Sequence, residues 1–221
     1  MLEVGGLVPF SATDYPGQIS AVIFCQGCPW RCSYCHNSHL QEFSSGNVKW
    51  HNIIDFLNRR RGLLDAVVFS GGEPTLQKAI FESIREVKSL GYLIGLHTAG
   101  IESSRFEQVL HLVDWVGLDV KALPENYDAI TGRKNSEKNV IDSLNLLVRS
   151  RIAYEVRTTV HDENSALSIG KLAEILSNAG VENYTLQIAR SSDRKEIPID
   201  PLILKTQLST ITPLFTKLGI R

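Results

Sequence analysis

Short apolar runs alternate with longer amphipathic stretches along most of the chain. Six of these runs have the length and composition of buried strands, at 21–24, 66–69, 92–96, 115–120, 154–160 and 184–188. Between and after them, apolar residues recur with helical spacing at 48–60, 77–90, 104–112, 137–149, 165–179 and 201–217. Strands that alternate with helices in this way predict an α/β fold built on a parallel sheet.

The length of the chain narrows the topology. A complete eight-stranded α/β barrel takes about 250 residues, and this chain has 221. Six β-α units therefore predict a partial (β/α)6 barrel that is laterally open. No Pro-, Gly- or Ser-rich linker divides the chain, so we expect one domain over 1–221. Its parts would be an N-terminal lead-in at 1–19, the barrel at 20–190, and a C-terminal tail and helix at 191–221.

Composition and charge exclude several classes of partner. The formal net charge is −1, with 43% hydrophobic and 21% charged residues. This balance produces no overall field that would attract nucleic acid or an anionic membrane. The opening MLEVGGLVPFS lacks the basic region of a secretory signal, and no apolar stretch approaches the ~20 residues that cross a bilayer. We expect a cytoplasmic protein whose cysteines stay reduced.

Polar or small residues follow each predicted strand at its carboxyl end. In chain order they are the cysteine loop at 25–35, then 70–75, 97–100, 119–121, 157–161 and 187–190. The carboxyl ends of parallel strands meet at one edge of a barrel, and α/β barrels place their chemistry at that edge. We therefore expect these side chains to form a single site.

All four cysteines lie in CQGCPWRCSYC, between residues 25 and 35. The spacing C-x3-C-x2-C of Cys28, Cys32 and Cys35 differs from ferredoxin spacings. Three thiolates on one loop can bind three irons of a 4Fe–4S cluster and leave the fourth open, as catalytic metal sites do. Cys25 ends the first strand run and is expected in the barrel wall as a small apolar residue. A four-thiolate zinc site is the alternative, although zinc ribbons pair their cysteines across ~15–20 residues.

The cysteine loop resembles the radical S-adenosylmethionine (SAM) superfamily. The hallmark of that superfamily is C-x3-C-x-aromatic-C, which here runs from Cys28 to Cys35 with Tyr34 as the aromatic residue. More narrowly, SATDYPG at 11–17 and CHN at 35–37 resemble the glycyl-radical-enzyme activating proteins. The opening GGLVPFSATDYPG resembles the branch that activates anaerobic ribonucleoside-triphosphate reductase.

This resemblance implies a reaction and its participants. SAM would bind the open iron, and one electron would cleave it to a 5′-deoxyadenosyl radical that takes hydrogen from a glycine of a partner enzyme. The partner would be the large subunit of anaerobic ribonucleotide reductase, and the electron donor flavodoxin or ferredoxin. No side chain is expected to be catalytic beyond the cluster and SAM. Two other functions stay open: a radical SAM enzyme acting on a modified-base precursor or a peptide, and a non-catalytic zinc-binding module.

The resemblance also implies that the Gly-Gly-Glu-Pro turn holds SAM. The backbone of Gly71 and Gly72 would receive the amino group, since glycine lets a ligand approach closely. Glu73 would accept from that amino group or lock the loop, and Thr98 would contact methionine or ribose atoms. An ordinary strand-to-helix turn is the alternative explanation for the glycines.

Two further groups of residues are implied as SAM contacts. Tyr34 would pack on the adenine, and the backbone through Cys35 and His36 would pair with its edge. Asp119 and Lys121 match an Asp-x-Lys of activating enzymes, and residues two apart on a strand face the same side. Lys121 would meet the SAM carboxylate, with a structural ion pair as the alternative.

The sequence departs from the resemblance at two strand ends. His97 stands where relatives carry an aspartate linked to a bound monovalent cation. The histidine puts that cation site in doubt, and a core histidine with its hydrogen bonds satisfied is an equally good explanation. Relatives have a histidine near the ribose on the sixth predicted strand, where this sequence has Gln187, with Arg190 farther on. Arg157, on the fifth predicted strand, needs carboxylate partners from the protein or from SAM.

Overall fold

The computed structural model describes residues 1–190 and 196–221. Within these ranges, one sheet holds eight strands in the order β1-β2-β3-β4-β5-β6-β7-β8. Their bounds are β1 (Val4–Ser11), β2 (Ser20–Cys25), β3 (Ala66–Gly71), β4 (Leu93–Thr98), β5 (Trp115–Asp119), β6 (Ala153–Val160), β7 (Asn183–Ile188) and β8 (Lys217–Ile220). Strand β1 is antiparallel to β2, and every later pair is parallel. The predicted α/β class and open parallel sheet are confirmed.

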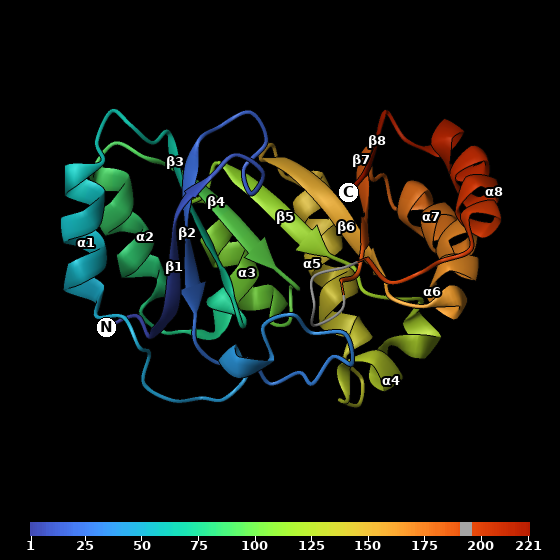
Figure 1. Cartoon of the computed structure of the whole chain (residues 1–221), viewed down its shortest axis with the longest axis horizontal. Coiled ribbons are helices and arrows are strands. Elements are labelled where there is room, and N and C mark those ends of the chain that lie inside the picture. The colour runs from blue at the N-terminus through green and yellow to red at the C-terminus, as the bar shows by residue number, and fades with distance from the viewer. Residues whose placement is uncertain (191–195) are drawn as a thin grey trace.

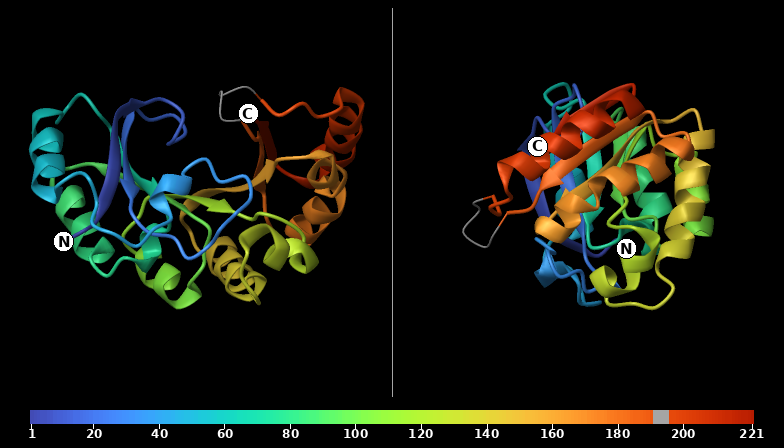
Figure 2. Two further views of the ribbon diagram at one scale, coloured as in Figure 1. Left: turned by 60° about the horizontal axis from the view of Figure 1, so that its bottom comes forward. Right: turned by 90° about the vertical axis from the view of Figure 1, so that its right-hand side faces the viewer.

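Helices cover the outer face of this sheet, which curls so that β1 and β8 form its two free edges (Figures 1 and 2). The helices are α1 (Trp50–Arg59), α2 (Ile80–Ser89), α3 (Ser103–Leu110), α4 (Tyr127–Thr131), α5 (Glu137–Arg149), α6 (Glu163–Leu167), α7 (Ile169–Asn178) and α8 (Pro201–Ile211). No helix in the two described ranges is both long enough and apolar enough to span a bilayer.

The structure corrects the prediction at both ends of the chain. The lead-in at 1–19 contains β1, and the helix predicted at 201–217 ends at Ile211 because Pro213 cannot continue it. Strand β8 follows in its place. The predicted tail begins with residues 191–195, which lie outside the described residues.

The pleat of the strands decides which side chains reach the interior of the curled sheet. On β2, Ala21, Ile23 and Cys25 join the main core beneath the helices, whereas Val22 belongs to a smaller interior cluster. Tyr15 of the β1–β2 loop packs in that smaller cluster, with its ring centroid 5.4 Å from that of Trp115. The alternation leaves polar side chains to line the interior toward the carboxyl ends of the strands.

Candidate active site

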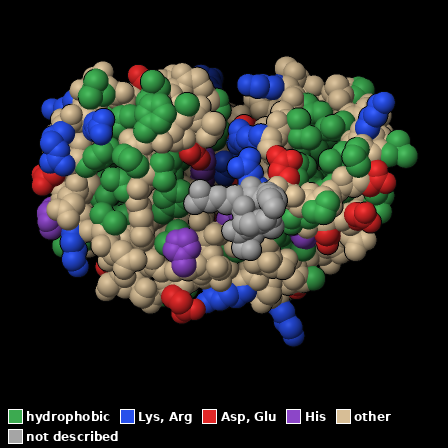
Figure 3. All heavy atoms as spheres, in the orientation of Figure 1, with side chains coloured by type: hydrophobic (Ala, Val, Ile, Leu, Met, Phe, Trp, Pro, Cys, Tyr) green, Lys and Arg blue, Asp and Glu red, His purple; other side chains and the backbone are tan. Residues whose placement is uncertain are grey.

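A cavity of about 360 Å³ lies at the carboxyl ends of the parallel strands. Its wall contains every residue that the sequence analysis assigned to the cluster or to SAM, namely Cys28, Cys32, Tyr34, Cys35, His36, Gly71, Gly72, Glu73, Thr98, Asp119 and Lys121. Figure 3 shows charged and histidine side chains in the hollow between the two halves of the molecule. The volume lies in the range of ~300–1,000 Å³ that small-molecule sites occupy.

The four cysteines divide into two environments. Cys28, Cys32 and Cys35 line the cavity and are partly exposed, whereas Cys25 is completely buried in the main core. Burial raises the pKa of Cys28 to about 12, and the Cys32 thiol adds to that rise. Iron would therefore have to displace protons from these thiols when it binds. Cys25 lies where the sequence placed it, in the wall and away from the other three.

The cluster loop, defined here as residues 26–37, is fastened to α4. The amide N–H of Arg31 donates to the carbonyl of Thr131 at 2.8 Å. The indole of Trp30 is 2% exposed and packs edge-on against Tyr127, with ring centroids 6.1 Å apart. Helix α4 was not predicted from the sequence, yet it supports the loop that carries the three exposed thiols.

The two glycines at the end of β3 pack against the cluster loop. A Cβ on Gly72 would lie 2.3 Å from the carbonyl oxygen of Gly27, and Gly71 has φ of +113°. The N–H groups of Gly72 and Glu73 donate to the carbonyls of Cys25 and Gly27, each at 2.9 Å. Packing alone thus requires glycine here, and these donors are already in use. Carbonyl oxygens are what this turn can offer to an ammonium group.

The carboxylate of Glu73 is buried and joins the ends of β3 and β4. It accepts hydrogen bonds from the Thr75 N–H at 3.1 Å and hydroxyl at 2.7 Å, from the Thr98 hydroxyl at 2.7 Å, and from the Ala99 N–H at 2.9 Å. Burial raises the pKa of Glu73, and these donors oppose the rise. The Thr98 hydroxyl also accepts from the Gly100 N–H at 3.0 Å. Of the two roles expected for Glu73, this geometry matches the lock.

Asp119, the last residue of β5, lies between two cations. Its carboxylate accepts from Nε of Arg157 at 2.7 Å and lies 3.6 Å from Nζ of Lys121. Burial would raise the pKa of Asp119, but Arg157 and Lys121 outweigh burial and lower it. Burial would likewise lower the pKa of Lys121, and the neighbouring Tyr34 and Asp119 raise it instead. Arg157 therefore has a protein carboxylate as its partner, and Lys121 presents a positive charge to the cavity.

His97 is a neutral, hydrogen-bonded histidine. Burial, with a smaller contribution from the charge of Arg157, lowers its pKa to about 3. Its Nε2 lies 2.8 Å from the carbonyl oxygen of Asp14, so Nε2 carries the proton that it donates. The imidazole also packs edge-on against Trp115 at 5.5 Å. The hydrogen bond satisfies the ring, but His97 is partly exposed and lines the cavity rather than the core.

The remaining predicted contacts are distributed along the rim. One face of Tyr34 stacks on His161, and Tyr34 also lines the cavity. The His36 imidazole accepts from the backbone N–H of Arg190 at 3.4 Å. Gln187 lines the cavity, whereas the Arg190 side chain does not.

Sequence reasoning missed several residues in the cavity wall. Thr13, Asp14 and Thr159 line it, as does Arg221, which forms an ion pair with Glu155. Thr159 shares a strand face with Arg157, and that period of two was a usable signal. Arg221 follows β8, which was not predicted, so nothing marked it.

Comparison with known proteins identifies the family. A family model described as the radical SAM superfamily matches residues 22–176. The chain belongs to the radical SAM superfamily. It is 32% identical over 210 residues to a protein of Methanocaldococcus jannaschii assigned as a glycyl-radical enzyme activating enzyme, covering 89% of this chain and 85% of that protein. It is also 32% identical over 186 residues to the pyruvate formate-lyase-activating enzyme of Clostridium pasteurianum, covering 80% and 75%.

Several solved structures share the fold. QueE from Escherichia coli superimposes with a TM-score of 0.62 at 15% identity, covering 100% of this chain and 93% of that chain. A domain of pyruvate-formate lyase-activating enzyme from Bacteroides vulgatus gives 0.59 at 15% identity, covering 71% and 99%. At these identities the similarity concerns the fold.

Family membership implies a 4Fe–4S cluster and SAM, and the cavity wall fits both groups. Three thiols line the wall, and the Lys121 ammonium lies beside Asp119 and near the Tyr34 ring of the same loop. Among the described residues, no three His, Cys, Asp or Glu side chains converge tightly enough to hold one metal ion. Ligands of a four-iron cluster need not converge on a point, because each thiolate binds a different iron.

Proposed function

We propose that this chain activates a glycyl-radical enzyme, with Cys28, Cys32 and Cys35 as the three cluster ligands. The observation that carries the proposal is the single cavity in which those thiols and all the expected SAM contacts meet. When bound, the reduced cluster supplies one electron to SAM, and the resulting 5′-deoxyadenosyl radical removes hydrogen from a glycine of the partner. The chain's own residues bind, orient and shield these groups.

Each wall of the cavity has a distinct task in this proposal. Cys28, Cys32 and Cys35 would hold three irons of the cluster, which would leave the fourth open to SAM. Lys121 pairs with the SAM carboxylate, while Arg157 holds Asp119 and so fixes the charge next to that lysine. The carbonyls of Gly71 and Gly72 receive the amino group, and Glu73 holds that turn against β4 rather than contacting SAM.

We further propose anaerobic ribonucleotide reductase as the partner and flavodoxin or ferredoxin as the electron donor, in the cytoplasm. Two observations support an activase: the names of the relatives at 32% identity, and the resemblance of residues 5–17 to the ribonucleotide reductase branch. The sheet leaves β1 and β8 unpaired with each other, and a laterally open barrel gives a protein loop room to enter.

The decisive experiment starts with anaerobic reconstitution. We expect about four irons per chain for a 4Fe–4S cluster, an electron paramagnetic resonance (EPR) spectrum that SAM perturbs, and 5′-deoxyadenosine after reduction with dithionite. Adding the reductase large subunit should produce a glycyl-radical doublet. Zinc without iron, or no 5′-deoxyadenosine, would overturn the proposal. Cleavage of SAM without a doublet on any glycyl-radical enzyme would leave a radical SAM enzyme with a different substrate.

A further inference from the structure

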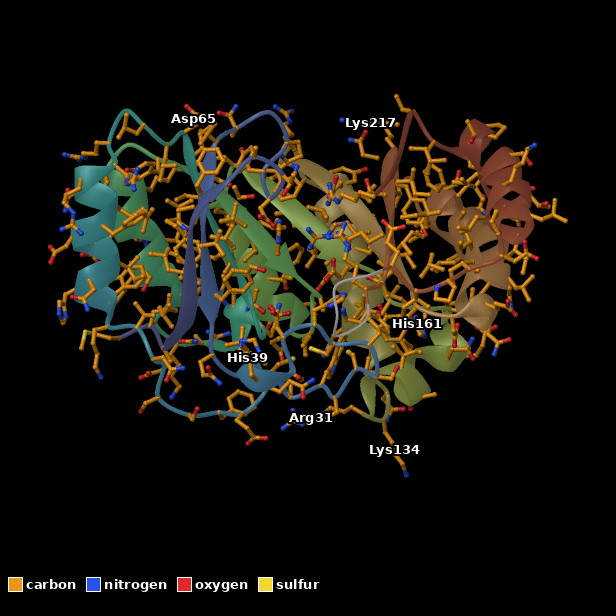
Figure 4. The ribbon with its side chains drawn as sticks, in the orientation of Figure 1. Arg31, His39, Asp65, Lys134, His161 and Lys217 are labelled. Carbon is orange, nitrogen blue, oxygen red and sulfur yellow. The ribbon has the colours of Figure 1, made fainter. Side chains whose placement is uncertain are left out.

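The aromatic residue of the cluster loop is stacked on a histidine from a distant strand end. The rings of Tyr34 and His161 are 4.4 Å apart at their centroids and inclined by 24°. Tyr34 lies between Cys32 and Cys35, whereas His161 directly follows β6, four strands along the sheet from β2. Figure 4 places His161 at the same edge of the molecule as Arg31 of the cluster loop, opposite Asp65 and Lys217. The stack thus ties the loop to the residue that follows β6.

His161 is itself held firmly. Its backbone N–H donates to the Ser165 hydroxyl at 2.9 Å. Its Nδ1 lies 3.3 Å from the carbonyl oxygen of Thr159, and because a carbonyl only accepts, Nδ1 carries the proton. Asp162 caps α6 by accepting from the Ser165 N–H at 2.7 Å. With only 11% of its side chain exposed, His161 presents a fixed ring face to Tyr34.

Tyr34 depends on its ring faces rather than its hydroxyl. Within the described residues, the Tyr34 hydroxyl is buried and has no hydrogen-bond partner. Lys121 also lies near the ring, with its Nζ 5.8 Å from the ring centroid. Lys121 is also the cation expected to meet the SAM carboxylate, so its position responds to the ligand. His161 is the ring neighbour of Tyr34 that has no expected role in binding SAM, and its ring is fixed by the hydrogen bonds above.

We propose that His161 is a positioning residue for the cluster: its ring holds Tyr34 and thereby the Cys32–Cys35 turn in the shape that binds iron. The turn is closed by the Cys35 N–H, which donates to the Cys32 carbonyl at 3.1 Å. Trp30 and Arg31 fasten the first half of the loop to α4, and the stack fastens the second half. This inference rests on the proposed function, because it concerns the same cluster.

Three substitutions separate the ring of His161 from its hydrogen bond. His161→Phe keeps an aromatic face but loses the donor to Thr159, His161→Asn keeps a donor but loses the ring, and His161→Ala loses both. The measurement is the rate at which each reconstituted protein loses iron to a chelator under anaerobic conditions. Since aromatic pairs contribute modestly beyond burial, we expect His161→Ala and His161→Asn to lose iron roughly three- to tenfold faster. His161→Phe should stay within about twofold of the wild type.

A second measurement excludes a general loss of stability. In cluster-free protein, His161→Ala should speed alkylation of the loop thiols under native conditions while the urea midpoint stays close to that of His161→Phe. His111→Ala, at the exposed end of α3, is the matched control and should behave as wild type. Equal iron retention in wild type and His161→Ala would overturn the inference. It would also be overturned if His161→Asn retained iron as wild type does while His161→Phe lost it faster. A wild-type protein that takes up no iron would instead overturn the proposed function, and the inference with it.

Discussion

Cys25 and Cys28 are three residues apart, and the pleat of β2 separates them completely. Cys25 is the last residue of the strand and points into the core with Ala21 and Ile23, whereas Cys28 lies on the loop at the cavity. Burial raises the pKa of Cys25 far above that of a free thiol. Such a thiol behaves as a small apolar group.

Replacing the buried Cys25 and replacing one of the three cavity cysteines should therefore have different consequences. Cys25→Ala should keep its iron and lose about 1 kcal/mol of unfolding free energy, since only one buried sulfur is removed. Cys32→Ala should lose the cluster with little change in the stability of the cluster-free chain. Iron and sulfide counts after anaerobic reconstitution, together with urea unfolding, measure both effects. Equal loss of iron in the two variants would contradict the three-ligand assignment.

His97 predicts a specific dependence of stability on pH. Its folded pKa of about 3 lies below the ordinary value near 6.5, so the unfolded chain binds a proton that the folded chain does not. Stability is therefore full above pH ~6.5 and falls by about 1.4 kcal/mol per pH unit until the folded pKa is reached. Between pH 6.5 and 5, the unfolding free energy of His97→Gln should therefore fall by about 2 kcal/mol less than that of the wild type. Urea unfolding at the two pH values tests this, and parallel profiles would refute it.

The residue types and their spacing in the sequence indicated which side chains meet in the site. The role of each side chain became visible only from its neighbours in the folded structure. The period of two along the strands placed Asp119 and Lys121 on one face, and the cysteine spacing separated Cys25 from the others. The Tyr34–His161 stack joins residues that are 127 positions apart in the chain. Local spacing carries no signal for such a contact, because only the curl of the sheet brings the two loops together.

At the scale of elements, the six central strands and most helices were predictable because each is a buried apolar run or an amphipathic stretch. The edges were not. Strand β1 contains Gly5, Gly6 and Pro9, which weaken a strand pattern and are tolerated at a sheet edge. Strand β8 is only four residues long and directly follows a helix signal that Pro213 interrupts. An edge strand is stabilised by pairing with a single neighbouring strand, and its own sequence gives little indication of that pairing.

The contact between the end of β3 and the cluster loop makes a prediction about an element rather than one side chain. In Gly72→Ala the new Cβ would sit 2.3 Å from the Gly27 carbonyl oxygen and 3.1 Å from that of Leu40, so the backbones must separate. We expect loss of the cluster and of SAM binding in a chain that still folds. Gly6→Ala is the control, because nothing lies within 4 Å of its Cβ position. Circular dichroism and iron content distinguish the outcomes, and a Gly72→Ala protein with full iron would disprove the contact's importance.

At the scale of the whole molecule, the sheet concentrates its polar groups at one end of an incomplete barrel. Loops that follow β2, β3, β4 and β5 all contribute to one cavity, and the cluster loop is fastened to α4 on one side and to the residue that follows β6 on the other. The unpaired edges of β1 and β8 leave the sheet unclosed (Figure 2). The fold therefore combines a firmly supported cofactor loop with an interior that a protein segment can approach.

Because the cavity joins loops from most of the sheet, SAM should stabilise the entire chain, but only when the cluster is present to receive it. At 100 times its dissociation constant, a ligand adds about 2.7 kcal/mol. For a chain of 221 residues, this corresponds to a rise of roughly 5–10 °C in the unfolding midpoint. Thermal unfolding of reconstituted protein with and without SAM measures it. Lys121→Met should reduce the rise by removing the cation for the carboxylate, and the cluster-free protein should show none. The same rise in cluster-free protein would mean that SAM binds without iron and would contradict the expected requirement for the cluster.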